Sequence, residues 1–511
     1  MTSDNWTRRR VLGTTAAAAL GSLTASAVSP GRAAAFVPNG RPVLTSGVQS
    51  GDAVGGSAVL WTRADRASRM VVEVSERPDL RGSRTLRGPL LREAHDFTGK
   101  VRIPGVRPGQ RLYYRVRAEA DHGRSSEPVT GSLFVPGRRD DIRFVWTGDI
   151  NGQGWGINPD IGGMRIFRAM RDVRPDFYLC SGDTIYADGP ISATQALPDG
   201  RVYRNVTTEA KSHVAENLDD FRGNYAYNLL DDNFRAFAAE VAQINQWDDH
   251  EVRNNWYPGQ VFTDDRYTEK RADVLAARAR QAFDEYLPVT PGRPMYRRLS
   301  YGPLMDLFVL DMRTCKDPND DNRYADPRRG LLGHEQREWL IRELRASVAT
   351  WKVIAIDLPL GLVVPDGPAA LEGVAQGDNG GPLGRELEFA RVLQTAHRCG
   401  VANIVFLTAD VHYAAAHHYD PARAAIGDFT PFWEFVSGPA NAGAFGPNTL
   451  DGTFGPEAVF VHAPPRANAS PMEGYQHFGE VQIDRDSAAM TVRLRDQDNV
   501  VLWSTTLSAA P

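Results

Sequence analysis

The chain has few cysteines and no long apolar run. Only Cys180, Cys315 and Cys399 occur among 511 residues, far apart, which excludes a scaffold of several disulfides. No stretch reaches the roughly 20 apolar residues that a membrane-spanning helix needs. The formal net charge of -5 gives no support to a specific nucleic-acid partner, although it leaves room for a local basic pocket. The composition, 42% hydrophobic and 24% charged, is typical of a large globular protein.

Residues 1–35 have the parts of an export peptide. Arg8, Arg9 and Arg10 precede a short, weakly apolar run, and small residues ending at Ala35 resemble a cleavage site. Paired arginines are typical of the twin-arginine type. The segment therefore predicts a secreted protein that uses the twin-arginine (Tat) export machinery. The alternative is a disordered N-terminal extension.

The pattern of apolar and polar residues changes near residue 138. Residues 36–138 carry short alternating runs separated by turn residues, which predicts an immunoglobulin- or fibronectin-like β-sandwich. Residues 139–511 alternate apolar strands with helical patterns, which predicts a mixed α/β domain. Strands are expected at 142–147, 176–181, 241–247, 351–356 and 403–409 and in 480–507, helices at 160–173, 272–287, 334–348 and 385–397, and a surface loop at 441–468.

Several of these strands stop at an aspartate. The carboxyl ends of neighbouring strands share one edge of an open sheet, so residues placed there converge in one crevice. Convergent carboxylates repel one another unless a cation neutralises them. The pattern therefore predicts a metal site, with strand-end candidates at Asp149, Asp183, Asp249, Asp357 and Asp410.

Asp149 and Asp183 occupy equivalent positions, and each follows a glycine that is expected to let the backbone approach a ligand. One carboxylate would bind a single ion and the other would bridge two. Tyr186 follows closely, and a phenolate is a hard anionic ligand that suits a strongly Lewis-acidic ion such as ferric iron. The alternative is a tyrosine hydroxyl hydrogen-bonded to a carboxylate.

The segment from Trp247 to Trp256 is the densest polar cluster. Crowded like charges destabilise a fold, so a functional site explains the cluster better than packing does. We assign Asp249 to a metal and His250 to the substrate side, where an imidazolium can protonate a leaving oxygen. Arg253 and Asn254 are candidates for orienting these groups.

Asp410 and His412 are two residues apart and lie on the same side of an extended chain, as two ligands of one centre would. Asp357 is a weaker candidate with a structural alternative. A strand-end ion pair is the simpler reading of Asp311 and Arg313, and phosphate contact is the alternative. Four further side chains are expected to be structural or inert: Cys180, His417, His418 and His477.

At these residues the chain resembles the PhoD-like alkaline phosphatases, a branch of the calcineurin-like metallophosphoesterases. The resemblance lies in Ser181–Asp188, Trp247–Asn255 and Thr408–Tyr413, and it extends over most of the chain. It implies a four-layer αββα catalytic domain, an iron centre with calcium ions, and release of phosphate from esters outside the cytoplasm. Well-known members carry Ser-Cys where this chain has Gly148-Asp149, which leaves the identity of the metals open.

Together these features predict a secreted, metal-dependent phosphoesterase in which a metal-bound hydroxide attacks phosphorus. Asp149, Tyr186 and His412 would hold an iron (Fe³⁺), and Asp183 would bridge. A second divalent ion, calcium or else manganese or magnesium, would take Asp249, Asp357 and Asp410. Other readings remain: a phosphodiesterase of the related phospholipase D type, a phosphate- or headgroup-binding protein without turnover, and a carbohydrate-binding role of the sandwich.

Overall fold

The structure is a computed structural model that describes residues 40–120, 123–138 and 140–510. The predicted export peptide lies outside these residues. In the described ranges, no helix combines the length and the apolar character needed to cross a bilayer.

The N-terminal strands form the expected β-sandwich. One layer contains β1 (Leu44–Val54), β2 (Ser57–Ala64) and β5 (Thr98–Pro104). The other has the order β4-β3-β6-β7, with bounds Arg84–Leu91, Ser68–Ser75, Gln110–Glu119 and Val129–Val135. Along β6, buried residues alternate with partly exposed ones, as in a strand with one face on a core.

Residues 140–510 complete one large sheet that also contains β1, β2 and β5, and they form a second, smaller sheet. The larger sheet has the order β24-β23-β22-β8-β9-β12-β1-β2-β5. Its strands β8, β9 and β12 are parallel and span Ile142–Thr147, Phe177–Ser181 and Ala242–Gln246. The antiparallel strands β22, β23 and β24 span His477–Ile483, Met490–Asp496 and Val501–Leu507.

The smaller sheet has the order β13-β14-β15-β18-β20-β19-β21. Its first four strands span Arg297–Tyr301, Met305–Val309, Trp351–Ala355 and Ile404–Thr408. The last three, β20, β19 and β21, span Phe432–Val436, Ala414–Tyr419 and Pro456–His462.

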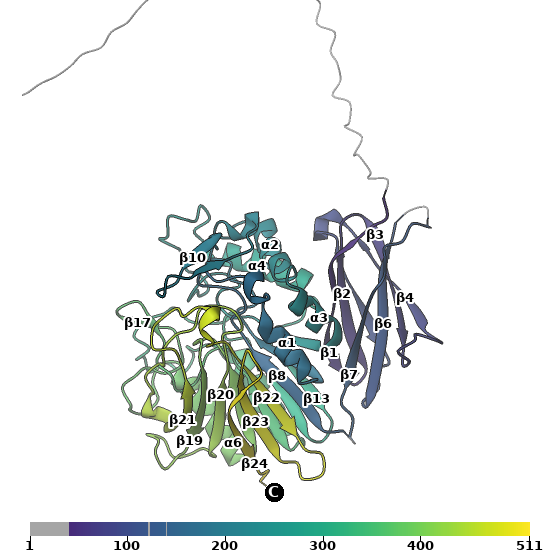
Figure 1. Cartoon of the computed structure of the whole chain (residues 1–511). Coiled ribbons are helices and arrows are strands. Elements are labelled where there is room, and N and C mark those ends of the chain that lie inside the picture. The colour runs from purple at the N-terminus through teal and green to yellow at the C-terminus, as the bar shows by residue number, and fades with distance from the viewer. Residues whose placement is uncertain (1–39, 121–122, 139, 511) are drawn as a thin grey trace, which may run out of the picture. The chain divides into compact units, whose positions relative to one another are not determined.

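Side-chain alternation along the strands builds the four layers (Figure 1). Phe144 and Trp146 of β8 enter a core shared with Leu307 of β14 and Val353 of β15, so this core fills the space between the two sheets. Val145 of β8 points the other way, into a separate core. That outer core includes the helices α1 (Arg165–Asp172), α2 (Leu218–Asn228), α3 (Asp232–Glu240) and α4 (Ala272–Tyr286).

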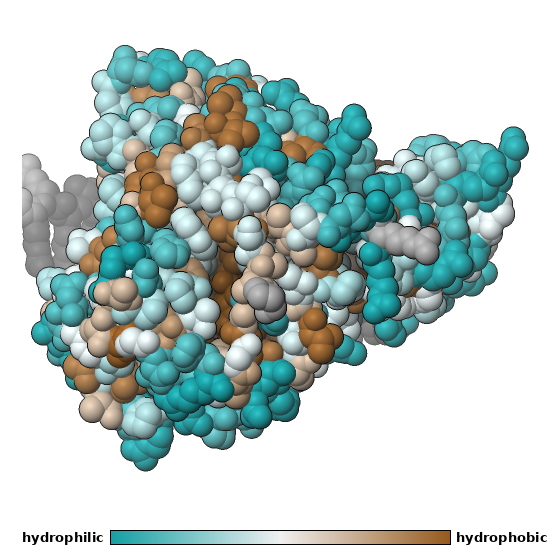
Figure 2. Space-filling model, turned by 90° about the horizontal axis from the view of Figure 1, so that it is seen from below, coloured by the Kyte–Doolittle hydropathy of each residue, from teal (hydrophilic) through white to brown (hydrophobic). Residues whose placement is uncertain are grey.

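Helices α5 (Gly333–Ala346) and α6 (Glu386–Arg398) cover the outer face of the smaller sheet. The arrangement is αββα, and it confirms the predicted fold class. Figure 2 shows one face of the molecule, where hydrophilic residues cover most of the surface and hydrophobic ones appear in small groups and along a narrow hollow.

Two local expectations were wrong. The predicted helix at 160–173 begins only at Arg165, because a 3-10 turn at Pro159–Ile161 is followed by Gly162 and Gly163 in left-handed conformations. The segment 441–468 is not simply a surface loop. Its first residues, Asn441 to Ala444, are buried, and it contains β21. The high glycine and proline content of this segment therefore led to the wrong prediction of a surface loop, although its first residues are buried.

Strands from both sides of the predicted boundary at residue 138 lie in one sheet. β1 runs parallel to β12, with Gly51 opposite Gln243. A Cβ atom on Gly51 would lie 2.7 Å from the carbonyl oxygen of Gln243 and 2.5 Å from that of Pro288. These contacts are shorter than real Cβ contacts, so only glycine permits the two strands to approach this closely.

Gly51→Ala should therefore lower the free energy of unfolding by about 1–3 kcal/mol, because rigid backbone atoms must move to admit the methyl group. The matched control is Gly427→Ala, where a Cβ meets no atom within 4 Å. Thermal unfolding of both variants checks the expectation. If both variants had the same midpoint of thermal unfolding, β1 and β12 would be able to move apart without loss of stability, contrary to the expectation.

Candidate active site

The predicted ligands gather where strands of both sheets end. Asp149, Asp183 and Asp249 follow β8, β9 and β12, which are neighbours in the larger sheet. Asp410 and His412 follow β18 of the smaller sheet. Three groups have ligand atoms within 4.8 Å of one another: Asp149, Asp183 and His412; Asp183, Asp249 and His250; Asp248, Asp249 and Asp410.

Adjacent groups share a carboxylate. Asp183 belongs to the first and second groups, and Asp249 to the second and third. Both residues are buried. A row of overlapping groups is the arrangement that neighbouring cations with bridging carboxylates require.

Four of these residues have an unusual backbone. The φ angles of Asp149, Asp183, Asp410 and His412 are 58°, 49°, 64° and 62°, in the left-handed region that side chains other than glycine rarely adopt. Such conformations cost free energy and concentrate at functional sites. The left-handed residue turns each chain segment where its strand ends, so the candidate metal-binding side chain lies at the edge of the sheet.

The glycines before the aspartates serve a different purpose from the one expected. A Cβ on Gly182 would lie 2.4 Å from the Cβ of Asp248, and one on Gly148 would lie 2.8 Å from the Cβ of Ala409. The glycines thus let neighbouring strand-end segments approach each other. Close packing of these segments, rather than access for a ligand, explains the two positions.

The Asp149 carboxylate fits a bound cation. It is fully buried, and neither of its oxygens has a hydrogen-bond partner among the described residues. Oδ1 lies 3.8 Å from Nε2 of His412. Burial raises the pKa of Asp149 to about 8. A buried carboxylate without donors is costly unless a positive charge lies beside it.

His412 is prepared to act as a neutral ligand. Its Nδ1–H donates to the carbonyl oxygen of Gly443, so Nε2 carries the lone pair and accepts a hydrogen bond from the Tyr186 hydroxyl. Burial lowers the pKa of His412 to about 3. The Tyr186 hydroxyl lies 2.8 Å from Nε2, and burial with the charges of Asp183 and Asp149 raises the tyrosine pKa well above its usual value. Tyr186 therefore needs a nearby cation before it can ionise.

His250 has the opposite character. Its Nδ1 lies 2.6 Å from Oδ1 of Asp188, and its ring lies 4.2 Å from that of Tyr186. Burial alone would lower the histidine pKa, but Asp188, Asp249 and Asp183 together raise it well above its usual value. Its Nε2 lies 4.0 Å from Asp249 Oδ1. The surrounding carboxylates thus favour the protonated form of His250 at the cleft, and Asp188 fixes its orientation.

The two predicted orienting residues behave differently. The backbone N–H of Asn254 donates to Oδ2 of Asp188 at 2.9 Å, and Asn254 lines the cleft. The Arg253 guanidinium lies 4.6 Å from the ring centre of Phe262 and 3.9 Å from Asp264. It does not line the cleft that the described residues form.

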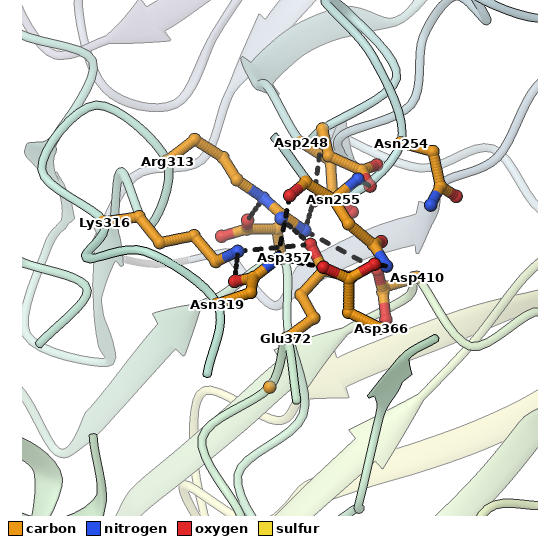
Figure 3. A network of polar contacts seen from close by, with 12 residues as sticks. Asp248, Asn254, Asn255, Arg313, Lys316, Asn319, Asp357, Asp366, Glu372 and Asp410 are labelled. Carbon is orange, nitrogen blue, oxygen red and sulfur yellow. Dashed lines mark hydrogen bonds and ion pairs between the residues drawn. The ribbon is translucent and has the colours of Figure 1, made fainter. Parts of the chain in front are cut away.

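Asp357 lies in a network of polar contacts around Arg313 that also contains Asp410 (Figure 3). Its Oδ2 accepts a hydrogen bond from Nε of Arg313 at 2.8 Å, and it belongs to none of the three ligand groups. Arg313 is fully buried and also donates to Asp248 and Glu372. It lies 3.7 Å from Asp410. Arg313 thus forms ion pairs, and its partners come from several segments that are distant in sequence.

Its relation to Asp311 differs from the expected strand-end pair. The Arg313 backbone N–H donates to Asp311 at 3.1 Å, while the guanidinium contacts other carboxylates. The expected structural histidines are held in place: His417 lies 3.2 Å from Glu434, and Nδ1 of His477 lies 3.0 Å from the carbonyl oxygen of Gly438.

Four acidic residues at the site escaped the sequence reasoning as site residues: Asp188, Asp248, Glu251 and Glu372. Glu251 accepts hydrogen bonds from the backbone N–H groups of Asp183, Thr184 and Asp248, and so ties two strand ends together. The polar cluster already contained Asp248 and Glu251. Glu372 follows a short hairpin and carries no comparable signal.

A cleft of about 520 Å³ opens over part of the site. Its lining includes the acidic residues Asp183, Asp249, Glu372 and Asp410, together with His250 and His412. Its rim is built from two loops that contribute apolar side chains beside the polar Asn448 and Thr449. One loop contributes Val363, Val364 and Pro365, and the other contributes Phe445 and Pro447.

Comparison with known proteins identifies the family. The model of the PhoD-like phosphatase matches residues 144–494, and the model of the N-terminal domain of PhoD-like phosphatases matches residues 31–134. Alkaline phosphatase D of Bacillus subtilis (strain 168) is 28% identical over 427 residues, which are 76% of this chain and 68% of that protein. The chain belongs to the PhoD-like phosphatase family and is a hydrolase of phosphoric esters.

Solved structures agree on the fold. A structure of PhoD matches with a TM-score of 0.69 and 21% identity over 92% of this chain and 90% of that one. A purple acid phosphatase from yellow lupin (Lupinus luteus) seeds matches with a TM-score of 0.55 and 12% identity, over 92% of this chain and 74% of that one.

Chelation should lower the thermal midpoint of the protein at pH 8, because removing cations would leave the buried carboxylates uncompensated. In Asp149→Asn the same treatment should have a smaller effect, since one unpartnered charge is gone. Calorimetry with and without a chelator, alongside metal analysis, measures this. Asp79→Asn, at an exposed position, is the control. An unchanged midpoint in the wild type would contradict the expectation.

Proposed function

We propose that this chain is an exported, metal-dependent phosphoesterase. The observation that supports it most is the buried Asp149 carboxylate, which has no hydrogen-bond partner in the part of the chain that the structure describes and lies beside the neutral imidazole of His412. A solely structural carboxylate would have hydrogen-bond partners, as buried polar groups ordinarily do.

We assign two ions to the overlapping groups. Asp149, Tyr186 and His412 would hold ferric iron, and Asp183 would bridge. Asp248, Asp249 and Asp410 offer only oxygen atoms, which suits calcium, manganese or magnesium. Asp248 takes the place first given to Asp357. When bound, such ions neutralise the carboxylates and lower the pKa of a water molecule so that it can attack phosphorus.

His250 would supply the proton that the leaving oxygen needs. As the bond from phosphorus to that oxygen breaks, Nε2 of the imidazolium would donate its proton, while Asp188 holds Nδ1. No lysine or arginine lines the cleft among the described residues. His250 is therefore the protein's own cation at the cleft, and the ions would have to balance the remaining charge of the phosphoryl group.

One observation favours phosphodiesters as a second candidate substrate class. The apolar rim formed by Val363, Val364, Pro365, Phe445 and Pro447 would accept an apolar group on the ester. A phosphodiester carries one negative charge fewer than a fully ionised monoester. A cleft without arginine or lysine suits that lower charge.

His250→Ala should reduce kcat by about 10²-fold or more. The loss should be larger for an alkyl phosphate than for p-nitrophenyl phosphate, because p-nitrophenolate leaves without needing a proton. Rates on both esters and on bis-p-nitrophenyl phosphate measure this and report the preference for monoesters or diesters.

The control is His418→Ala, whose side chain lies on β19 outside the cleft. Asp183→Asn, which removes the proposed bridging carboxylate, should lose activity on every ester. Full activity in Asp183→Asn would remove the bridge from the mechanism. An equal loss on all esters in His250→Ala would exclude its role as proton donor.

Export is a separate part of the proposal, supported by the sequence of residues 1–35. Arg8→Lys/Arg9→Lys keeps the positive charge and removes the arginine pair, so it should retain the protein inside the producing cells. Arg32→Lys is the matched control. Cell fractionation followed by immunoblotting gives the result, and normal export of the double variant would contradict a twin-arginine route.

A further inference from the structure

A second cavity, of about 600 Å³, shares no lining residue with the catalytic cleft. We call it the arginine cavity. It lies where the end of β1, the start of β2 and β5 meet α4, β13 and α5. Five arginines line it, against two acidic residues, Asp52 and Glu343: Arg102, Arg280, Arg293, Arg297 and Arg298.

Three of these arginines are held by acidic partners. Arg297 donates to Asp52 at 2.9 Å, and Arg298 donates to Asp306 at 2.6 Å. Arg280 donates to Asp284 at 3.2 Å. These hydrogen bonds hold the three arginine side chains in place, and they engage the carboxylates of Asp52, Asp306 and Asp284.

Positive charge remains on the other two. The side chains of Arg102 and Arg293 are exposed, and neither has a hydrogen bond or an ion pair within the described ranges. They come from different elements, β5 and the segment between α4 and β13. In addition, Nε of Arg298 is buried without an acceptor. The cavity therefore presents guanidinium donors that the protein does not satisfy.

Aromatic rings form another part of the wall. Tyr296 and Trp339 lie with ring centres 4.9 Å apart, and Phe283 lines the same cavity. Guanidinium groups bind phosphate and carboxylate oxygens in pairs, and aromatic rings pack against flat apolar groups. The lining combines both kinds of recognition in a volume suited to a small molecule.

We propose that the arginine cavity binds a small organic anion that carries a phosphate-type group beside an aromatic ring. Arg102 and Arg293 contact the anionic group, and Tyr296 and Trp339 pack against the ring. Binding is reversible and involves no reaction at this site. The proposal goes beyond ester hydrolysis and does not depend on it.

The probe is phenylphosphonate, whose carbon–phosphorus bond an ester hydrolase does not cleave. Isothermal titration of the metal-loaded wild type should show two binding events, one in the catalytic cleft and one in the arginine cavity. Arg102→Gln/Arg293→Gln should weaken one event about tenfold or more and leave hydrolysis of p-nitrophenyl phosphate unchanged. The matched control for charge is Arg168→Gln/Arg345→Gln, at two exposed positions outside both cavities.

Two further ligands test the chemistry. Methylphosphonate lacks the ring and should bind the arginine cavity more weakly, while benzoate tests whether a carboxylate substitutes for the phosphonate. Identical titrations for wild type and Arg102→Gln/Arg293→Gln would overturn the proposal. Equal affinity for methylphosphonate would overturn the role of Tyr296 and Trp339. If the wild type did not hydrolyse esters, the proposed function would be wrong, but the proposal for the arginine cavity would be unaffected.

Discussion

The need to balance negative charge in a buried place governs this structure. Several carboxylates lie at the meeting edge of two sheets, where burial weakens the screening of their charges by water. The protein's own basic side chains there include Arg313, Lys316 and His250. Their positions divide the acidic residues into those that pair with a basic side chain and those that do not.

Arg313 defines the first set. Its guanidinium pairs with Asp357, Glu372 and Asp248, although its single positive charge offsets only part of their combined negative charge. Asp149 defines the second set, because neither of its oxygens has a hydrogen-bond partner among residues 40–120, 123–138 and 140–510. Asp248 lies at the border, since its Oδ1 pairs with Arg313 while its Oδ2 has no partner in the described part of the chain. The same network that stabilises the fold thus shapes the oxygen-rich group at Asp249 and Asp410.

Much of this architecture was predictable because strands and their ends carry a strong pattern. Short apolar runs followed by aspartate located β8, β9, β12, β15 and β18 closely. Helix α4 was expected at 272–287 and spans Ala272–Tyr286. Asp357 obeys the same strand-end rule as Asp410, yet its carboxylate turns toward Arg313. Which carboxylate meets an arginine depends on residues distant in sequence, and no local pattern records that.

The relation between Asp188 and His250 shows a second limit. The two residues are far apart in the chain, and the hydrogen bond between them exists only because β9 and β12 are neighbours. Glu372 is a similar case. Periodicity and spacing reveal elements and their ends, whereas partners across elements follow from the order of strands in the sheet.

The pairing of β1 with β12 gives the N-terminal sandwich a role besides adding a domain. Without β1, the strand that carries the segment of Asp248, Asp249 and His250 would be the border of its sheet, with unpaired peptide groups open to other chains. The sandwich caps that border. The pairing of β1 with β12 therefore protects this sheet edge from pairing with other copies of the chain. It also stabilises the strand that precedes the site residues Asp248, Asp249 and His250.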